Sequence, residues 1–330
     1  MKRTLQFAVA IGISALCVWL SMREVDLARV AESLRNANYL GFAAVMAITL
    51  FAFWVRAIRW RLLLRVDRPI AGMSLFSATM IGFMANNVLP FRLGEFVRPW
   101  ALARREKLSK SMTLATIVVE RAIDMLTLLA IFGVALLVSP IAENTSAGRL
   151  VQGGARILLV LSVVLTVFVV AAERNRRLAH SLLRLAPAAI RDRAGRLLDR
   201  FLDGFALFRD LGRLAQVFAL SFGMFLSFAF ALWITGWSLD IALPWYAGLV
   251  MLVVTAIGIM VPAAPGYVGT LNVACTAGLA LYGVGKTPAS AYGWFYFFSQ
   301  WLPITAVGLW FLNREGLSLQ SLGHVQDDAP

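Results

Sequence analysis

The sequence contains few charged side chains for its length. Only 15% of its 330 residues are charged, whereas 60% are hydrophobic, and the mean hydropathy is +0.75. A soluble domain has roughly 25% charged residues, so this chain has too little polar side chain to cover a surface that faces water. The composition excludes an ordinary soluble enzyme and predicts an integral membrane protein.

Cysteine and histidine, the usual ligands of transition metals, are almost absent. Cys17 and Cys275 lie in apolar segments, and His180 and His324 lie far apart in polar segments. These spacings form neither a metal site nor a disulfide framework. The chain also lacks the phosphate-binding loop G-x-x-x-x-G-K-[ST]. We therefore predict no metal, no cofactor and no direct use of ATP.

Acidic residues are outnumbered, and the net charge of +13 lies mainly between apolar runs. A pI near 10.8 often indicates nucleic-acid binding. Here the basic residues lie between apolar runs, which indicates membrane topology, so we predict no nucleic-acid partner. The positive-inside rule places residues 56–68, 91–111 and 173–213 in the cytoplasm. It places the loops 139–152 and 239–243 outside, because they contain almost no basic residues.

Long apolar runs recur along the whole chain, and a run of about 20 residues is enough for a helix to cross a bilayer. The predicted spans are residues 4–22, 40–57, 112–138, 154–172, 214–238, 244–261 and 289–312. Residues 24–38 alternate apolar and charged side chains, which is typical of a short amphipathic surface helix, and we place it outside. We expect an all-α polytopic membrane protein with about 6–8 transmembrane helices.

The domain organisation follows from the same pattern. We expect one transmembrane domain over residues 1–315 and a polar tail over residues 316–330. Lys2 and Arg3 precede the first run, so the N-terminus is expected in the cytoplasm. Small residues in the spans permit, without requiring, a homo-oligomer.

Two apolar segments are poor candidates for a complete crossing. Residues 73–90 lie between two basic flanks, and one crossing cannot return to the same side. Residues 250–285 are interrupted by Pro262, Pro265 and Gly266. We predict re-entrant elements over residues 73–98 and 250–285, with complete spans of sparse charge as the alternative. Broken elements in both halves of a membrane protein indicate a transport site.

The first re-entrant element contains a polar motif over residues 86–98. Its polar residues are Asn86, Asn87, Arg92, Glu95 and Arg98, and its helix breakers are Pro90 and Gly94. Arg92, Glu95 and Arg98 share one face if the helix resumes, and arginine forks suit phosphate groups. The alternative is an interfacial cluster of arginines that snorkel to water.

A second motif places Glu120, Arg121 and Asp124 inside the apolar run 112–138. Charges within a span mark either a functional path or a structural ion pair, and both interpretations stay open. Two acids and one base leave a negative charge, and we expect Arg92 or Arg98 to balance it.

The third motif is the break that contains Pro265, Gly266, Gly269 and Asn272. A helix that restarts near Thr270 would direct its positive N-terminus into the break, where an anion could bind. A simple kink or an external loop is the alternative. We expect the breaks at 86–94 and 262–269 to meet near the middle of the membrane.

Together these motifs resemble one family. N-N-x-x-P-x-R-x-G-E-x-x-R, then E-R-x-x-D, then P-x-x-P-G-x-x-G-T-x-N are similar to the flippase-like membrane domain of lysylphosphatidylglycerol synthases. The resemblance covers nearly the whole chain and implies movement of lipid between leaflets, in a bacterial inner membrane. The full synthases carry a soluble aminoacyl-transfer domain after the membrane part, whereas this sequence stops at residue 330, so lipid aminoacylation is not expected.

We therefore predict a flippase-like or scramblase-like transporter whose partner is a membrane lipid, either anionic or a polyprenyl or glycolipid. The predicted substrate-binding residues are Asn86, Asn87, Arg92, Glu95, Arg98, Glu120, Arg121, Asp124, Pro265, Gly266, Gly269 and Asn272. One alternative is a membrane transferase that uses a lipid-linked donor. Another is a non-catalytic scaffold that recruits enzymes of a lipid pathway through residues 173–213.

Overall fold

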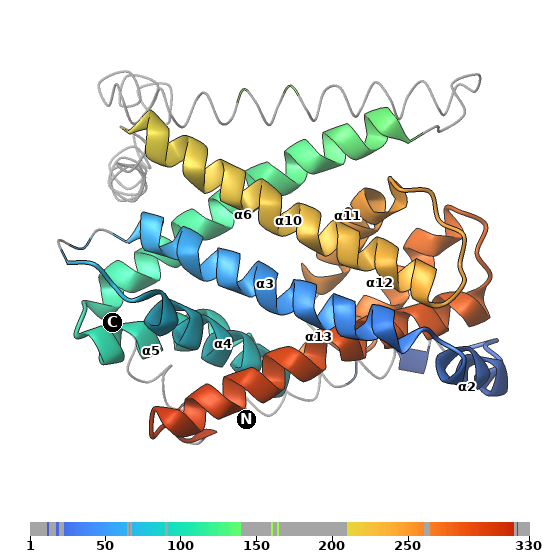
Figure 1. Ribbon diagram of the computed structural model, residues 1–330, viewed down its shortest axis with the longest axis horizontal. Coiled ribbons are helices and arrows are strands. Elements are labelled where there is room, and N and C mark those ends of the chain that lie inside the picture. Colours follow the sequence, from blue (N-terminus) through green and yellow to red (C-terminus); the bar gives the residue numbers. More distant parts are fainter. Residues whose placement is uncertain are drawn as a thin grey trace, which may run out of the picture.

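The computed structural model describes residues 23–139 and 210–319, apart from residues 65, 67, 90, 91 and 261–264, together with residues 12, 18, 19, 160, 164 and 322. The predicted spans at 4–22 and 154–172, and the basic segment from 173 to 209, lie outside these described residues. Every regular element in the described part is helical (Figure 1), which confirms the predicted all-α fold class.

Four of the described helices are long and apolar enough to cross a membrane. They are α3 (Tyr39–Leu63), α6 (Lys110–Val138), α10 (Leu211–Ser238) and α13 (Lys286–Arg314). At 1.5 Å per residue, the shortest of them, with 25 residues, is about 38 Å long. The predicted spans at 40–57, 112–138, 214–238 and 289–312 all lie within these helices.

Polar side chains cap the N-termini of three of the long helices, α3, α6 and α10, which therefore begin before the apolar runs. Asn38 accepts a hydrogen bond from the backbone N–H of Leu40, and Ser109 accepts one from Met112. Asp210 accepts from the N–H groups of the first turn of α10.

The predicted surface helix is α2 (Leu27–Arg35), within residues 24–38. Asp26 caps its N-terminus, and of its side chains only Val30 is buried. The ammonium group of Lys286 donates a hydrogen bond to Glu24, which lowers the pKa of that carboxyl group. This contact connects the segment before α2 to the start of α13.

Helices α3 and α10 form the central antiparallel pair (Figure 1). The backbone N–H of Asn38, before α3, donates to the carbonyl of Ser238, at the end of α10, over 2.8 Å. Because the start of one helix meets the end of the other, the two run in opposite directions. The helix α6 packs across both of them.

The first predicted re-entrant element is a helical hairpin of α4 (Gly72–Val88) and α5 (Gly94–Glu106). Its helices have 17 and 13 residues, about 26 and 20 Å. A Cβ atom on Gly94 would collide with the carbonyl oxygen of Gly82, so glycine allows the two helices to touch. Asn86 Oδ1 accepts from Gly94 N over 2.8 Å and caps the N-terminus of α5.

The second predicted re-entrant element is also a hairpin, of α11 (Ala247–Met260) and α12 (Thr270–Ala280), which pack on each other. The one-turn 3-10 helix η2 (Pro265–Tyr267) lies in the break between them. Gly266 has φ 75° and Gly269 has φ 88°, a region that favours glycine. These two glycines therefore permit the chain reversal that ends α11 and starts α12.

The turns of the two hairpins contact each other, as predicted from the two breaks. The guanidinium of Arg92 lies 5.3 Å from the ring centre of Tyr267. A Cβ atom on Gly266 would lie 3.3 Å from the carbonyl oxygen of Asn87. Asn87 also donates to Thr305 of α13 over 3.0 Å, so α13 supports the junction between the hairpins.

Candidate functional site

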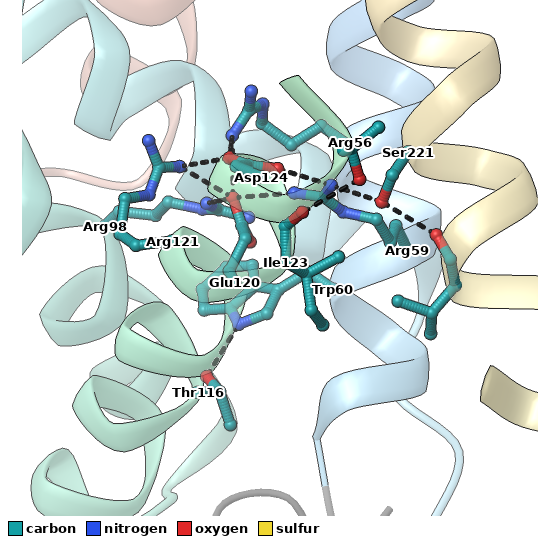
Figure 2. Close-up of polar contacts among 12 residues, drawn as sticks. Arg56, Arg59, Trp60, Arg98, Thr116, Glu120, Arg121, Ile123, Asp124 and Ser221 are labelled. Atoms are coloured by element: carbon teal, nitrogen blue, oxygen red, sulfur yellow. Dashed lines mark hydrogen bonds and ion pairs between the residues drawn. The ribbon is translucent and has the colours of Figure 1, made fainter. Parts of the chain in front are cut away.

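Charged side chains from three helices meet inside the helical bundle. We call this group the charge cluster: Arg56 and Arg59 of α3, Arg98 of α5, and Glu120, Arg121 and Asp124 of α6 (Figure 2). The side chains of Arg59 and Glu120 are 0% exposed. The cluster is therefore an interior feature and not part of a solvated face.

The carboxylate of Glu120 is the centre of the cluster. Its Oε1 atom accepts from Arg56 Nη1 over 2.7 Å, from Arg98 Nη1 over 2.8 Å and from Arg121 Nη2 over 2.9 Å. Arg59 Nη2 lies 3.2 Å from the same oxygen. Four guanidinium groups thus contact one carboxylate oxygen, in short charge-assisted contacts.

Asp124, one helical turn after Glu120, is the second carboxylate that contacts both arginines of α3. It accepts from Arg59 Nη1 over 2.6 Å and from Arg56 Nη1 over 3.2 Å. Arg59 Nη1 also donates to Ser221 of α10 over 2.7 Å, to the right of the cluster in Figure 2. The cluster therefore joins α3, α5, α6 and α10.

Aromatic side chains cover the buried arginines. Arg98 lies over the ring of Trp60 at 4.1 Å from its centre, and Arg56 lies 5.2 Å from the ring centre of Phe83. The indole N–H of Trp60 donates to Thr116 over 2.8 Å, which fixes the orientation of the ring. These rings keep water away from the guanidinium groups, and this strengthens their electrostatic interactions.

One side of the cluster is more accessible. The side chain of Arg121 is 42% exposed, and Glu95 of α5, at 32%, lies 3.9 Å from it. Arg92, in the turn of the first hairpin, is partly buried. We call Arg92, Glu95 and Arg121 the rim, because they lie between the buried arginines and the surface.

Several buried N–H groups of the arginines donate to no protein atom among the described residues. Those without any such contact are Nε of Arg56, Arg59 and Arg98, and Nη2 of Arg92 and Arg98. An unsatisfied buried donor costs about 1–3 kcal/mol. The four guanidinium groups of the cluster face two buried carboxylates and, 3.9 Å from Arg121, the partly exposed carboxylate of Glu95, so positive charge is in excess by one. One buried acceptor, Glu120 Oε2, also lacks a partner among the described residues, but the unpartnered donors outnumber it, so the cluster is suited to bind an anion.

Two cavities lie at helix ends. One, of about 470 Å³, lies beside Arg61, Arg68 and Arg213. Another, of about 320 Å³, lies beside Arg104, Arg105 and Arg314. Among the described residues, no group of three His, Cys, Asp or Glu side chains is placed to hold a metal ion.

The structure brings together five of the predicted site residues: Glu95, Arg98, Glu120, Arg121 and Asp124. Arg98 is one of the cations predicted to balance the acids. Arg92 does not pair with them, since its guanidinium lies over Tyr267 instead.

The other predicted residues shape the hairpins. Asn86 caps α5 and Asn87 bonds to α13. Asn272 of α12 is buried and donates weakly to the carbonyl of Ser290 over 3.4 Å, so it joins α12 to α13. Pro265, Gly266 and Gly269 form the break before α12.

Arg56 and Arg59 were missed. The sequence pattern assigned residues 56–68 to a basic cytoplasmic segment and did not indicate that α3 continues to Leu63 with Arg56 and Arg59 buried in the bundle. The available signal was their spacing of three within residues that are otherwise apolar, which places both on one helix face.

Comparisons with known proteins agree with the membrane fold. The family model described as "Lysylphosphatidylglycerol synthase TM region" matches residues 7–308. The chain is also similar to "Glycosyltransferase AglD" of Haloferax volcanii, at 29% identity over 138 residues. That alignment covers 41% of this chain and only 22% of the relative. No solved structure matches.

Proposed function

The chain belongs to the family of the lysylphosphatidylglycerol synthase transmembrane region, and from this premise we propose that it moves an anionic lipid, or a polyprenyl or glycolipid with an anionic headgroup, between the two leaflets of a membrane. Its family and its four long apolar helices make it a multi-pass membrane protein. The proposal places it in a bacterial inner membrane with its N-terminus in the cytoplasm.

The observation that carries this proposal is the buried charge cluster with spare guanidinium donors. A purely structural ion pair is matched charge for charge, because an unbalanced buried charge is costly. Here Arg56, Arg59, Arg98 and Arg121 contact Glu120 and Asp124. The excess positive charge is understandable if a negatively charged headgroup binds there during transport.

The two hairpins are the second feature that supports transport. Non-helical backbone at membrane depth is tolerated where protein buries it or where it lines a water-filled path. The turns of both hairpins meet at Arg92 and Tyr267. Arg92 lies in the turn that leads into α5, the helix that carries Arg98 of the charge cluster. A relative movement of the hairpins would therefore open the rim and expose the cluster to a headgroup.

The test is lipid movement across proteoliposomes that hold the purified protein. Fluorescent anionic and neutral lipids are followed with an impermeant quencher, for wild type, Arg98→Gln and Glu120→Gln. Arg29→Gln is the matched control, because that arginine is 78% exposed on α2. We expect movement that favours anionic lipid, and a loss of at least about tenfold in both cluster variants, equivalent to about 1.4 kcal/mol.

Folding is checked for every variant by size-exclusion chromatography and thermal unfolding. Folded wild-type protein that moves no lipid would refute the proposal. Equal movement by wild type and both cluster variants would leave translocation in place but remove the charge cluster from it.

The similarity to a protein named a glycosyltransferase favours a second candidate, a transferase that uses a lipid-linked donor. Anchored carboxylates can act as general bases, and Glu120 and Asp124 are the buried candidates. The test is transfer of a radiolabelled sugar from a polyprenyl-phosphate donor to an acceptor by the purified protein. Transfer that is lost in Glu120→Gln would support this candidate, and no transfer in wild type would reject it.

A further inference from the structure

We propose that the charge cluster and its rim select a headgroup that carries two negative charges, such as a phosphate monoester, over a phosphodiester that carries one. The inference rests on the proposed function, because it names the class of lipid bound at the same site. It follows from a count of charges, from the free edge of one arginine and from the position of the rim.

The charged side chains of the cluster and the rim are counted together. They contain five arginines, at positions 56, 59, 92, 98 and 121, and three carboxylates, at positions 95, 120 and 124, which leaves two positive charges. The other charged side chains described on α3, α5 and α6 lie near the helix ends, for example Arg61, Arg105 and Glu106. One charge of this surplus belongs to the buried arginines at positions 56, 59 and 98, which face the buried Glu120 and Asp124, and the other belongs to the partly exposed rim.

An arginine surplus cannot be relieved by loss of a proton, because the guanidinium stays charged at any physiological pH. The remaining way to balance it is an anion. A phosphodiester has one negative charge and leaves one positive charge unbalanced. A phosphate monoester has about −1.5 to −2 at pH 7, and it matches the surplus.

The geometry of Arg98 fits a phosphate headgroup. Its Nη1 atom is used by Glu120, whereas its Nε and Nη2 atoms donate to no protein atom among the described residues. These two nitrogens form one edge of the guanidinium plane, and this edge makes paired hydrogen bonds to two oxygens of a phosphate. Arg98 is 2% exposed, so the free edge is an interior feature.

The rim allows the surplus to be changed without removal of a fully buried group. Arg121→Gln lowers the surplus from two charges to one, and Glu95→Gln raises it to three. Arg92→Gln also lowers the surplus to one, by replacing the rim arginine that contacts Tyr267. If one of these variants fails to fold, the others still test the charge count.

The experiment measures binding to the purified full chain in a neutral detergent, by native mass spectrometry at pH 7.5. The probes are phosphatidic acid, a monoester, and phosphatidylglycerol, a diester, with identical acyl chains. We expect wild type and the control Arg29→Gln to prefer phosphatidic acid by at least about tenfold. The preference is expected to fall below about threefold in Arg121→Gln and Arg92→Gln, and to be kept in Glu95→Gln.

A pH series provides an independent readout, since the second ionisation of a phosphate monoester has a pKa of about 6. Below it, phosphatidic acid carries one charge, so the preference should disappear by pH 5. The charged or titratable groups that face the site are the five arginines, Glu95, Glu120, Asp124 and Tyr267 of η2. Glu95 is the exposed carboxylate among them, and the same pH response in Glu95→Gln assigns the change to the lipid.

Equal binding of the two lipids by wild type, or an unchanged preference in Arg121→Gln and Arg92→Gln, would overturn the inference. The transport assay with the same lipids separates it from the proposed function. Equal movement of both lipids would overturn the inference and support translocation. Selective binding of phosphatidic acid without movement would support the inference and refute translocation.

Discussion

The replacement Glu120→Gln tests the charge cluster most directly. Glu120 is fully buried, and its Oε1 atom lies within 3.2 Å of nitrogens from four arginines. Glutamine has almost the same shape but no charge, so Asp124 alone would then face the buried guanidinium groups. Removal of one partner from a buried ion pair costs about 3–5 kcal/mol. We expect a loss of that size in the free energy of unfolding.

The assay is reversible unfolding in mixed micelles, followed by tryptophan fluorescence, and Glu32→Gln on the exposed face of α2 is the matched control. The control should change the unfolding free energy by less than about 0.5 kcal/mol. The double variant Arg98→Gln/Glu120→Gln should cost less than the sum of the single variants by about 0.5–3 kcal/mol, because it removes one charge of each sign. A loss in Glu120→Gln no larger than in the control would refute the geometry described above.

Two further replacements test the hairpins. Gly94→Ala places a methyl group against Gly82 and should lower the unfolding free energy by about 1–3 kcal/mol. The control Gly223→Ala, with nothing within 4 Å of the new methyl group, should be neutral or slightly stabilising. Equal thermal unfolding temperatures for the two variants would contradict this packing. Tyr267→Leu removes the contact between Arg92 and the Tyr267 ring, worth about 0.5–2 kcal/mol, and should therefore change the rate of lipid movement in proteoliposomes. An unchanged rate would show that this contact has no part in transport.

Helix positions could be predicted from the sequence because a bilayer imposes a length on apolar runs. The runs at 40–57 and 214–238 lie inside α3 and α10. The two hairpins were predicted from different signals, namely basic residues on both flanks of 73–90 and the prolines and glycines after residue 261. These signals are local, so a single sequence reveals them.

The site was predicted only in part, because its contacts are distant in sequence. Arg56 is 64 positions from its partner Glu120, and nothing near Arg56 indicates that partner. The positive-inside rule counts arginines near helix ends as loop residues, and it therefore did not indicate that Arg56 and Arg59 are buried between helices. Conversely, Asn272 ends a conspicuous motif of prolines and glycines, yet it lies in α12, and its weak hydrogen bond reaches the carbonyl of Ser290 in α13.

The sequence left open whether the acids of α6 belong to a structural ion pair or to a functional path, and we propose that these two roles belong to different arginines. Arg56 and Arg59 are balanced in charge by Glu120 and Asp124, and all four side chains are at most 7% exposed. This quartet fastens α3 to α6. Arg98, with its free edge, and the rim supply the surplus positive charge.

That division predicts that stability and lipid binding respond to different replacements. Arg59→Gln breaks the quartet and its hydrogen bond to Ser221, so it should cost about 3–5 kcal/mol of unfolding free energy. Arg121→Gln removes a side chain that is 42% exposed, and it should cost at most about 1 kcal/mol while it weakens the binding of phosphatidic acid. Unfolding in mixed micelles and native mass spectrometry measure the two effects on the same samples. If Arg121→Gln lost as much stability as Arg59→Gln, all four arginines would belong to one structural unit, and the surplus would have to be explained without a ligand.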